Sequence, residues 1–442
     1  MNFRNKITTK IKIKQTLKQL LMKKKSIVAI LLFASYLTSA QDSTHKTNDI
    51  SVNKQSIQKK SDDIDVNYDR SSMYTLMIAN SSRDYESDIK SYFENKLTPD
   101  KYNNHNLNER FINSAFKKKD QLDNIVDYLN ENKIAHQLIA KWFNRSEKGG
   151  FNIDLIKQRG YYDASASEIN QAKYAKRGMS QLINPEVIKK LIDNTFILII
   201  DSKYTNKEDV AKTGKSILSL LGKLPGAGSM VNQLTNIGGG LVLDTFGKGF
   251  WVSTNAHLFK LVWDDEIAAR FENELWCDDK TITPEKKAAF DNADFFALEY
   301  VGTDQSGADI QSTGFTSKTN GELVGRATVK SIENVITKLQ QNYDVFKSKT
   351  PIYTSEPITA KIGLKEGVTK KTKFEVLEQQ LNTDGTLEFV QVGAVKVDSN
   401  YLIWDNRYGA DEENPNQGTD KTYFKAVSGK EFAPGMLLRQ IK

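Results

Sequence analysis

The chain has 442 residues, of which 39% are hydrophobic and one is a cysteine, and its formal net charge is +7. The positive excess comes from residues 1–40, which hold nine Lys and Arg and no Asp or Glu, so residues 41–442 carry −2. A basic pI normally suggests a nucleic-acid or anionic-membrane partner. Because the excess is confined to one short segment, the composition argues against a nucleic-acid-binding protein. A single cysteine also rules out an internal disulfide.

Residues 22–41 have the three-part layout of a secretory signal peptide. Three consecutive lysines precede an apolar run of eleven residues, 27–37, and the small residues 38–40 follow. The apolar run is too short to cross a bilayer as a helix, which takes about 20 apolar residues. We therefore expect residues 1–40 to be a signal peptide, with Met22 as the favoured start and Met1 as the alternative. The protein would then be exported, to the periplasm, the outer membrane or the medium.

The sequence pattern changes twice along the rest of the chain. Residues 41–68 are polar and charged, which is typical of a disordered tether. Residues 69–350 alternate helical patterns with apolar strands such as 73–79 and 195–201, and the second of these suits a strand buried on both faces. From 351 to 442 short strands alternate with glycine turns. The sequence therefore predicts a mixed α/β body followed by a small β-rich module, either a barrel or an open sheet.

The spacing of apolar residues predicts the individual elements. Helices are expected over 83–97, 120–131, 165–177, 265–276 and 331–346, with a continuing apolar pattern over 134–143. Ser82 is the expected cap of the first helix, and the acidic run 264–266 is expected to start the fourth. Residues 250–252 and 257–263 are expected to pair as a β-hairpin. In the C-terminal module, strands are expected near 358–362, 373–378, 389–397 and 401–404.

The sequence shows no catalytic or metal-binding pattern, and we expect no cofactor. No histidine lies two, three or four residues from another histidine or from Cys277, so zinc-site spacing is missing. A G-x-S-x-G nucleophile elbow is missing as well. We interpret His136 and His257 as packed structural residues and Cys277 as a small apolar filler beside Trp276. The four histidines are His45, His105, His136 and His257.

Two further patterns match ligand sites only in part. Residues 213–216 end like a nucleotide-binding P-loop, but Asp209 stands where that loop needs a glycine, and its carboxylate would repel phosphate. We therefore interpret Lys215 as a solvated helix residue. The acidic run 411–413 lies in a loop, 406–421, that is rich in Asn, Asp and Gly. We interpret this loop as solvated surface, with calcium binding as the alternative.

Residues 224–249 combine glycines with apolar side chains. Because glycines rather than charges interrupt the apolar residues, two interpretations stay open. The segment is either a buried connection or a flexible element that docks on a membrane or a partner. Solvent exposure would decide between them, since an exposed apolar patch of more than a few hundred Å² marks a docking surface.

Several stretches together resemble an uncharacterised family of secreted proteins from Bacteroidetes. They are LIAKWFNR (138–145), QRGYYDAS (158–165), LIDNTFILIID (191–201), HLFKLVWDDE (257–266), IWDNRYGADEE (403–413) and VSGKEFAPGMLLRQIK (427–442). The resemblance spans about residues 73–442 and implies an envelope or secreted location. It brings no activity, cofactor or functional residue. More distantly, 358–378 with 392–397 is similar to small barrel modules of bacterial envelope assembly proteins, a likeness of fold alone.

The sequence as a whole favours an exported, envelope-associated protein with a binding or structural role. Its expected partner is an envelope protein or a surface polymer, and no catalytic residue is assigned. Two alternatives stay open. One is a secreted hydrolase whose Asp, Glu, Ser and His residues assemble only in space. The other is a protein that contacts the membrane through residues 224–249.

Overall fold

The computed structural model describes residues 71–96, 99, 101–113, 119–160, 185–212, 249–311, 318–381, 387–413, 418–429 and 431–441. The predicted signal peptide, the tether 41–68, the helix 165–177, the P-loop-like residues 213–216 and the glycine-rich segment up to residue 248 lie outside them. By its contacts the chain divides into two units. The described residues of the first lie within Lys133–Asn194 and Leu261–Leu298, and those of the second within Val66–Asn132, Thr195–Lys260 and Glu299–Lys442.

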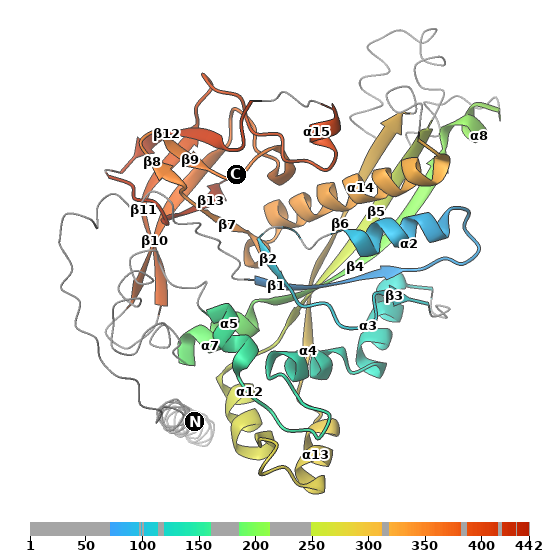
Figure 1. Cartoon of the computed structure of the whole chain (residues 1–442), viewed down its shortest axis with the longest axis vertical. Helices are drawn as coiled ribbons and strands as arrows, with labels where there is room; N and C mark the ends of the chain where they lie inside the picture. Colours follow the sequence, from blue (N-terminus) through green and yellow to red (C-terminus); the bar gives the residue numbers. More distant parts are fainter. Residues whose placement is uncertain are drawn as a thin grey trace, which may run out of the picture. The chain divides into compact units, whose positions relative to one another are not determined.

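The second unit contains a six-stranded sheet, the first sheet, with the main strand order β2-β1-β4-β5-β6 (Figure 1). β1 pairs in parallel with β2, β3 and β4, whereas β4 and β5 are antiparallel. The predicted strands 73–79 and 195–201 are confirmed, and the first eight residues of β4 are all buried. The strands are β1 (Ser71–Ile78), β2 (Tyr102–Asn104), β3 (Phe111–Ile112), β4 (Thr195–Asn206), β5 (Gly249–Leu261) and β6 (Leu298–Gln311).

The predicted hairpin of 250–252 and 257–263 is wrong, because both halves belong to the single strand β5. The polar residues between them resemble a turn in sequence, but each has a partner on β4. Thr254 lies opposite Ser202, and their hydroxyl oxygens are 2.9 Å apart in the buried sheet. A mutual hydrogen bond removes the cost of burying two hydroxyl groups, so the strand continues without a break.

Helices cover the first sheet. Side chains of α2 and α14 join those of β1, β4 and β5 in one buried apolar core, and Figure 1 shows these two helices along the same side of the strands. α3 contacts the opposite face, where Gln121 Nε2 donates to Asp201 Oδ2 at 3.0 Å. The helices of this unit are α2 (Glu86–Asn95), α3 (Gln121–Glu131), α8 (Lys207–Lys212), α14 (Asn320–Asn342), η7 (Asp344–Phe346), η8 (Leu364–Glu366) and α15 (Ala410–Glu413).

Two predicted helix starts are wrong. α2 is preceded by Tyr85 in a left-handed conformation (φ 56°), while the Ser82 hydroxyl donates to Asn80 within a turn. α14 begins at residue 320 instead of 331, after a capping box of Thr319 and Glu322. Two glycines, 321 and 325, weaken the helical signal there. Packing requires them, since a Cβ at Gly325 would lie 2.3 Å from the Tyr92 ring of α2.

The C-terminal residues form a second sheet of seven strands, curled into a half-barrel, in the order β7-β13-β10-β11-β12-β9-β8. A mixed α/β chain with a β-rich C-terminal part is therefore confirmed. The strands 358–362, 373–378 and 389–397 are confirmed in outline, 401–404 is not a strand, and β12 and β13 are new. The strands are β7 (Lys349–Pro351), β8 (Thr354–Ser355), β9 (Ile358–Ala360), β10 (Lys373–Leu381), β11 (Leu387–Val397), β12 (Thr422–Ser428) and β13 (Leu437–Ile441).

The predicted boundary between 350 and 351 falls inside β7, and the contacts place this sheet in the same unit as the first sheet. Its concave core contains Phe374, Val395 and Phe424, together with other buried aliphatic side chains. We call residues 349–441 the C-terminal module.

The first unit is helical and rich in aromatic side chains. The acidic cap is confirmed, because Asp264 accepts from the amide of Ile267 at 2.8 Å. The predicted helix 265–276 is an α-helix that continues as a π-helix. No helix among the described residues is long and apolar enough to cross a membrane. The elements are α4 (Ile134–Trp142), α5 (Asp154–Gly160), α7 (Pro185–Asp193), α12 (Asp265–Arg270), η5 (Phe271–Leu275) and α13 (Pro284–Asp291).

Candidate functional site

His257 on β5 is buried, as expected of a structural histidine, with 7% of its surface exposed. Its Nδ1 lies 2.7 Å from the Thr303 hydroxyl, which is 2.7 Å from the Tyr300 hydroxyl on the same strand, β6. Burial lowers the pKa of His257, so the imidazole is neutral at pH 7. Because the Thr303 hydroxyl is engaged on both sides, this chain of side chains fits a structural bridge between β5 and β6.

His136 and Cys277, both in the first unit, also fit the structural interpretation. His136 Nε2 lies 2.5 Å from the carbonyl oxygen of Ala293, and its ring meets Phe290 and Phe296 edge-on. Burial lowers the pKa of His136. Cys277 is a buried free cysteine, and burial raises the pKa of its thiol. A protonated, enclosed thiol is a poor nucleophile.

Within the acidic run 411–413, Glu412 is engaged in ion pairs. Glu412 Oε1 lies 3.0 Å from Arg326 Nη1, and Glu412 Oε2 lies 3.6 Å from Lys318 Nζ. These cations hold the pKa of Glu412 below its ordinary value. Among the described residues, no group of three His, Cys, Asp or Glu side chains could hold a metal ion.

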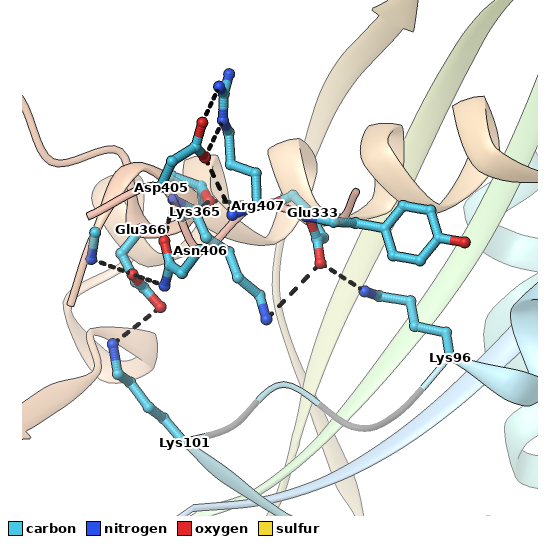
Figure 2. A network of polar contacts seen from close by, with 11 residues as sticks. Lys96, Lys101, Glu333, Lys365, Glu366, Asp405, Asn406 and Arg407 are labelled. Carbon is cyan, nitrogen blue, oxygen red and sulfur yellow. Dashed lines mark hydrogen bonds and ion pairs between the residues drawn. The ribbon is translucent and has the colours of Figure 1, made fainter. Parts of the chain in front are cut away.

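A network of polar side chains in the second unit surrounds two carboxylates, Glu333 on α14 and Glu366 on η8 (Figure 2). Glu333 Oε1 lies 3.0 Å from Lys96 Nζ and 3.8 Å from Lys365 Nζ. Glu333 Oε2 accepts from the amide of Tyr408 at 3.0 Å. We call this group the ionic cluster. Its residues are Lys96, Lys101, Glu333, Lys365, Glu366, Asn406 and Tyr408.

Glu366 has the more complete set of partners. Its Oε1 lies 3.0 Å from Lys101 Nζ, and its Oε2 accepts from the Gly363 amide at 2.8 Å and from Asn406 Nδ2 at 2.9 Å. Burial alone would raise the pKa of Glu366, but Lys101, Asn406 and the Gly363 amide together hold it below its ordinary value. The carboxylate is therefore ionised at neutral pH and is unsuited to act as a general acid.

Local backbone geometry positions Glu366. η8 starts after Gly363, where an added Cβ would lie 2.2 Å from the carbonyl oxygen of Trp404, and it ends at Gly367 with φ 72°. Asn406 also accepts from the amide of Lys365 at 2.9 Å, so one side chain links η8 to the segment 404–408. The ionic cluster therefore joins α14 and the chain before β2 to two parts of the C-terminal module, η8 and the segment 404–408.

A small pocket beside the ionic cluster is lined by Lys101, Tyr102, Glu333, Gln340 and Lys365, among others. Its volume of about 20 Å³ holds one water molecule but no metabolite. The paired charges and hydrogen bonds fit a structural role for the cluster, that of holding the C-terminal module on α14. None of its residues was predicted from the sequence, and the turn Gly363-x-x-Glu366-Gly367 was the one local signal.

The edge of the first sheet at β6 is covered. Three alternate carbonyl oxygens of β6 accept hydrogen bonds from side chains of α14 and its C-cap. Thr303 O accepts from Tyr343 at 3.1 Å, Gln305 O from Lys338 at 2.7 Å, and Gly307 O from Asn334 at 3.1 Å. Occupied carbonyl groups oppose the addition of another strand. A contact surface has to be sought elsewhere.

The outer face of the C-terminal module offers such a surface. The rings of Tyr401 and Tyr423 stack with centroids 4.2 Å apart and an interplanar angle of 14°, and Tyr401 is 47% exposed. Next to them Leu402 is 69% exposed. The loop that carries Tyr401 and Leu402 is fixed at both ends. The amide of Asp398 donates to Tyr423 O at 2.9 Å, and the amide of Trp404 donates to Thr422 Oγ1 at 3.2 Å.

No protein-family model matches the chain, and a search of curated proteins found no similar sequence. The resemblance to secreted Bacteroidetes proteins stays a prediction, so the function has to be inferred from the residues themselves.

Proposed function

We propose that the protein is exported and acts in the cell envelope as a binding or structural protein without catalysis. Its partner is an envelope protein or a surface polymer, which the C-terminal module contacts. The observation that carries this proposal is the exposed pair Tyr401 and Leu402 on a fixed loop, with the Tyr401 ring stacked on the half-buried Tyr423 of β12. Exposed aromatic and aliphatic side chains that are already ordered lose little conformational freedom on binding, which favours recognition.

The structural role of the ionic cluster supports the same proposal. Asn406 and the Tyr408 amide attach the chain just after Tyr401 and Leu402 to α14 and η8. A recognition loop anchored at this point keeps one conformation. Glu366 and Glu412 are bound in structural contacts, and the Nδ1 atom of His257 is engaged with the Thr303 hydroxyl.

We expect the double variant Tyr401→Ala/Leu402→Ala to bind isolated cell envelopes about tenfold more weakly than the natural protein, because truncating a central contact costs over about 1.4 kcal/mol. Co-sedimentation of the purified chain with envelopes measures this. Val345→Ala is the matched control, since Val345 is 56% exposed and lies outside the C-terminal module. Unchanged co-sedimentation of the double variant would count against the proposed surface.

A further inference from the structure

The outer face of the C-terminal module carries a row of lysines across three neighbouring strands. Lys373 on β10 lies directly opposite Lys396 on β11, and Lys396 lies directly opposite Lys425 on β12. The neighbours of Lys373 and Lys396 in sequence, such as Phe374, Val395 and Val397, point into the buried core. Since side chains alternate along a strand, the three lysines point outward from the same face.

This arrangement is electrostatically unfavourable without a partner. Adjacent strands are about 4.8 Å apart, and like charges directly opposite one another destabilise a sheet. In the described part of the chain, no carboxylate lies within ion-pair distance of Lys373 or Lys396, and both are exposed. Two more exposed lysines, 370 and 371, lie in the turn that leads into β10. Such a row is stable when anions lie along it.

Lys425 has one counter-ion, and it belongs to the same surface. Asp398 Oδ1 lies 3.1 Å from Lys425 Nζ. The Asn400 amide, which donates to Asp398, lowers the pKa of this carboxyl most, and Lys425 and Lys396 lower it further. A single carboxylate leaves the row with a net positive charge. Two residues after Lys373 on β10, by contrast, Glu375 forms an ion pair with Arg439 on the neighbouring strand β13.

The stacked tyrosines adjoin the lysine row. Tyr423 lies two residues before Lys425 on β12, so both side chains are on the outer face, and Tyr401 covers the Tyr423 ring. An exposed aromatic ring packs against the C–H face of a sugar, while lysine ammonium groups pair with carboxylate or phosphate groups. The strand spacing is close to the length of one sugar unit in an extended chain, so consecutive units can meet consecutive lysines.

We propose that this face binds an acidic polysaccharide, with its anionic groups along Lys373, Lys396 and Lys425 and a sugar ring on Tyr401. This inference deepens the proposed function and rests on it, because an exported protein in the envelope is within reach of such a polymer. An anionic membrane would use the lysines but has no need of the stacked rings. The near-neutral charge of residues 41–442 is compatible with this site, because net charge averages over the chain whereas the row is local.

The test uses the full purified chain with alginate, a linear polyuronate, as the probe. We expect Lys373→Gln/Lys396→Gln/Lys425→Gln to bind alginate at least tenfold more weakly and to reduce the salt dependence of binding, because fewer counterions are released. The control Lys119→Gln/Lys148→Gln/Lys280→Gln removes the same charge at exposed positions outside the module and should bind normally. Tyr401→Ala should weaken binding and Tyr401→Phe should retain it.

Three outcomes would overturn the inference. They are no binding of alginate by the natural chain, equal losses in the two triple variants, and lysine-dependent binding to phosphatidylglycerol vesicles that exceeds binding to alginate. Neutral dextran and thermal unfolding of each variant serve as controls for unspecific binding and for folding. The proposed function is tested separately, since binding to envelopes through Tyr401 and Leu402 can persist when the natural chain fails to bind alginate.

Discussion

Glu366→Ala is expected to lower the free energy of unfolding by about 3–5 kcal/mol, because it leaves Lys101 as a buried charge without its carboxylate partner. The amide of Gly363 and the side chain of Asn406 lose an acceptor in the same step. Urea unfolding followed by circular dichroism measures the change. Glu299→Ala is the matched control, since Glu299 is exposed and its loss should change stability by about 0.5 kcal/mol or less.

The carboxyl group of Glu366 also makes the free energy of unfolding depend on pH, in a direction that its lowered pKa determines. Because the folded protein holds the pKa of Glu366 below its ordinary value, the unfolded chain takes up a proton at higher pH than the folded chain. The stabilisation by Glu366 is therefore complete above the ordinary glutamate pKa, about 4.3, and is lost as the pH falls through the lower pKa of the folded state. Glu366→Gln should remove this part of the acid sensitivity. An identical acid dependence in the two proteins would contradict the assignment.

Phe374→Ala is expected to destabilise the protein by about 3–5 kcal/mol. The Phe374 side chain is fully buried in the core of the C-terminal module, and its ring meets Phe424 edge-on with centroids 5.4 Å apart. Truncation removes apolar contacts and leaves a cavity that the packed half-barrel cannot collapse to fill. The midpoint and slope of urea unfolding report the effect.

Val427→Ala is the matched control for this change. Val427 lies on β12, the strand that also carries Phe424, and is exposed, so we expect a loss of about 0.5 kcal/mol or less. A loss for Phe374→Ala as small as that of the control would mean that the second sheet does not enclose the core described here.

Local patterns predicted the parts of the fold that local chemistry decides. The apolar run of β4 identified a strand buried on both faces, and Asp264 identified a helix start. The prediction was wrong where a distant contact decides the local structure. The polar residues at 253–255 continue a strand because β4 supplies their partners, and Gly321 and Gly325 belong to a helix because α2 packs against them.

The ionic cluster could not be predicted for the same reason. Lys96 and Glu333 are paired although they lie far apart in the sequence, and nothing near either residue indicates the other. The lysine row is partly visible in the sequence, because each lysine alternates with apolar residues. Its register is not visible, since the pairing of β10, β11 and β12 depends on a bulge between Val376 and Leu377 and another between Ala394 and Val395.

We propose one way in which these parts of the chain work together. The first sheet and α14 provide a fixed support, and the ionic cluster attaches the C-terminal module to it. The module then presents the stacked tyrosines and the lysine row on its outer face. In the proposed function, this support holds the outer face of the module in one position.

The measurement that tests the central claim most directly is N-terminal sequencing of the protein recovered from fractionated cells. We expect the protein in the envelope fraction or the medium, with a sequence that begins after residue 40, at Gln41. An intact leader, with residues 23–37 still present on protein in the cytosolic fraction, would contradict this expectation.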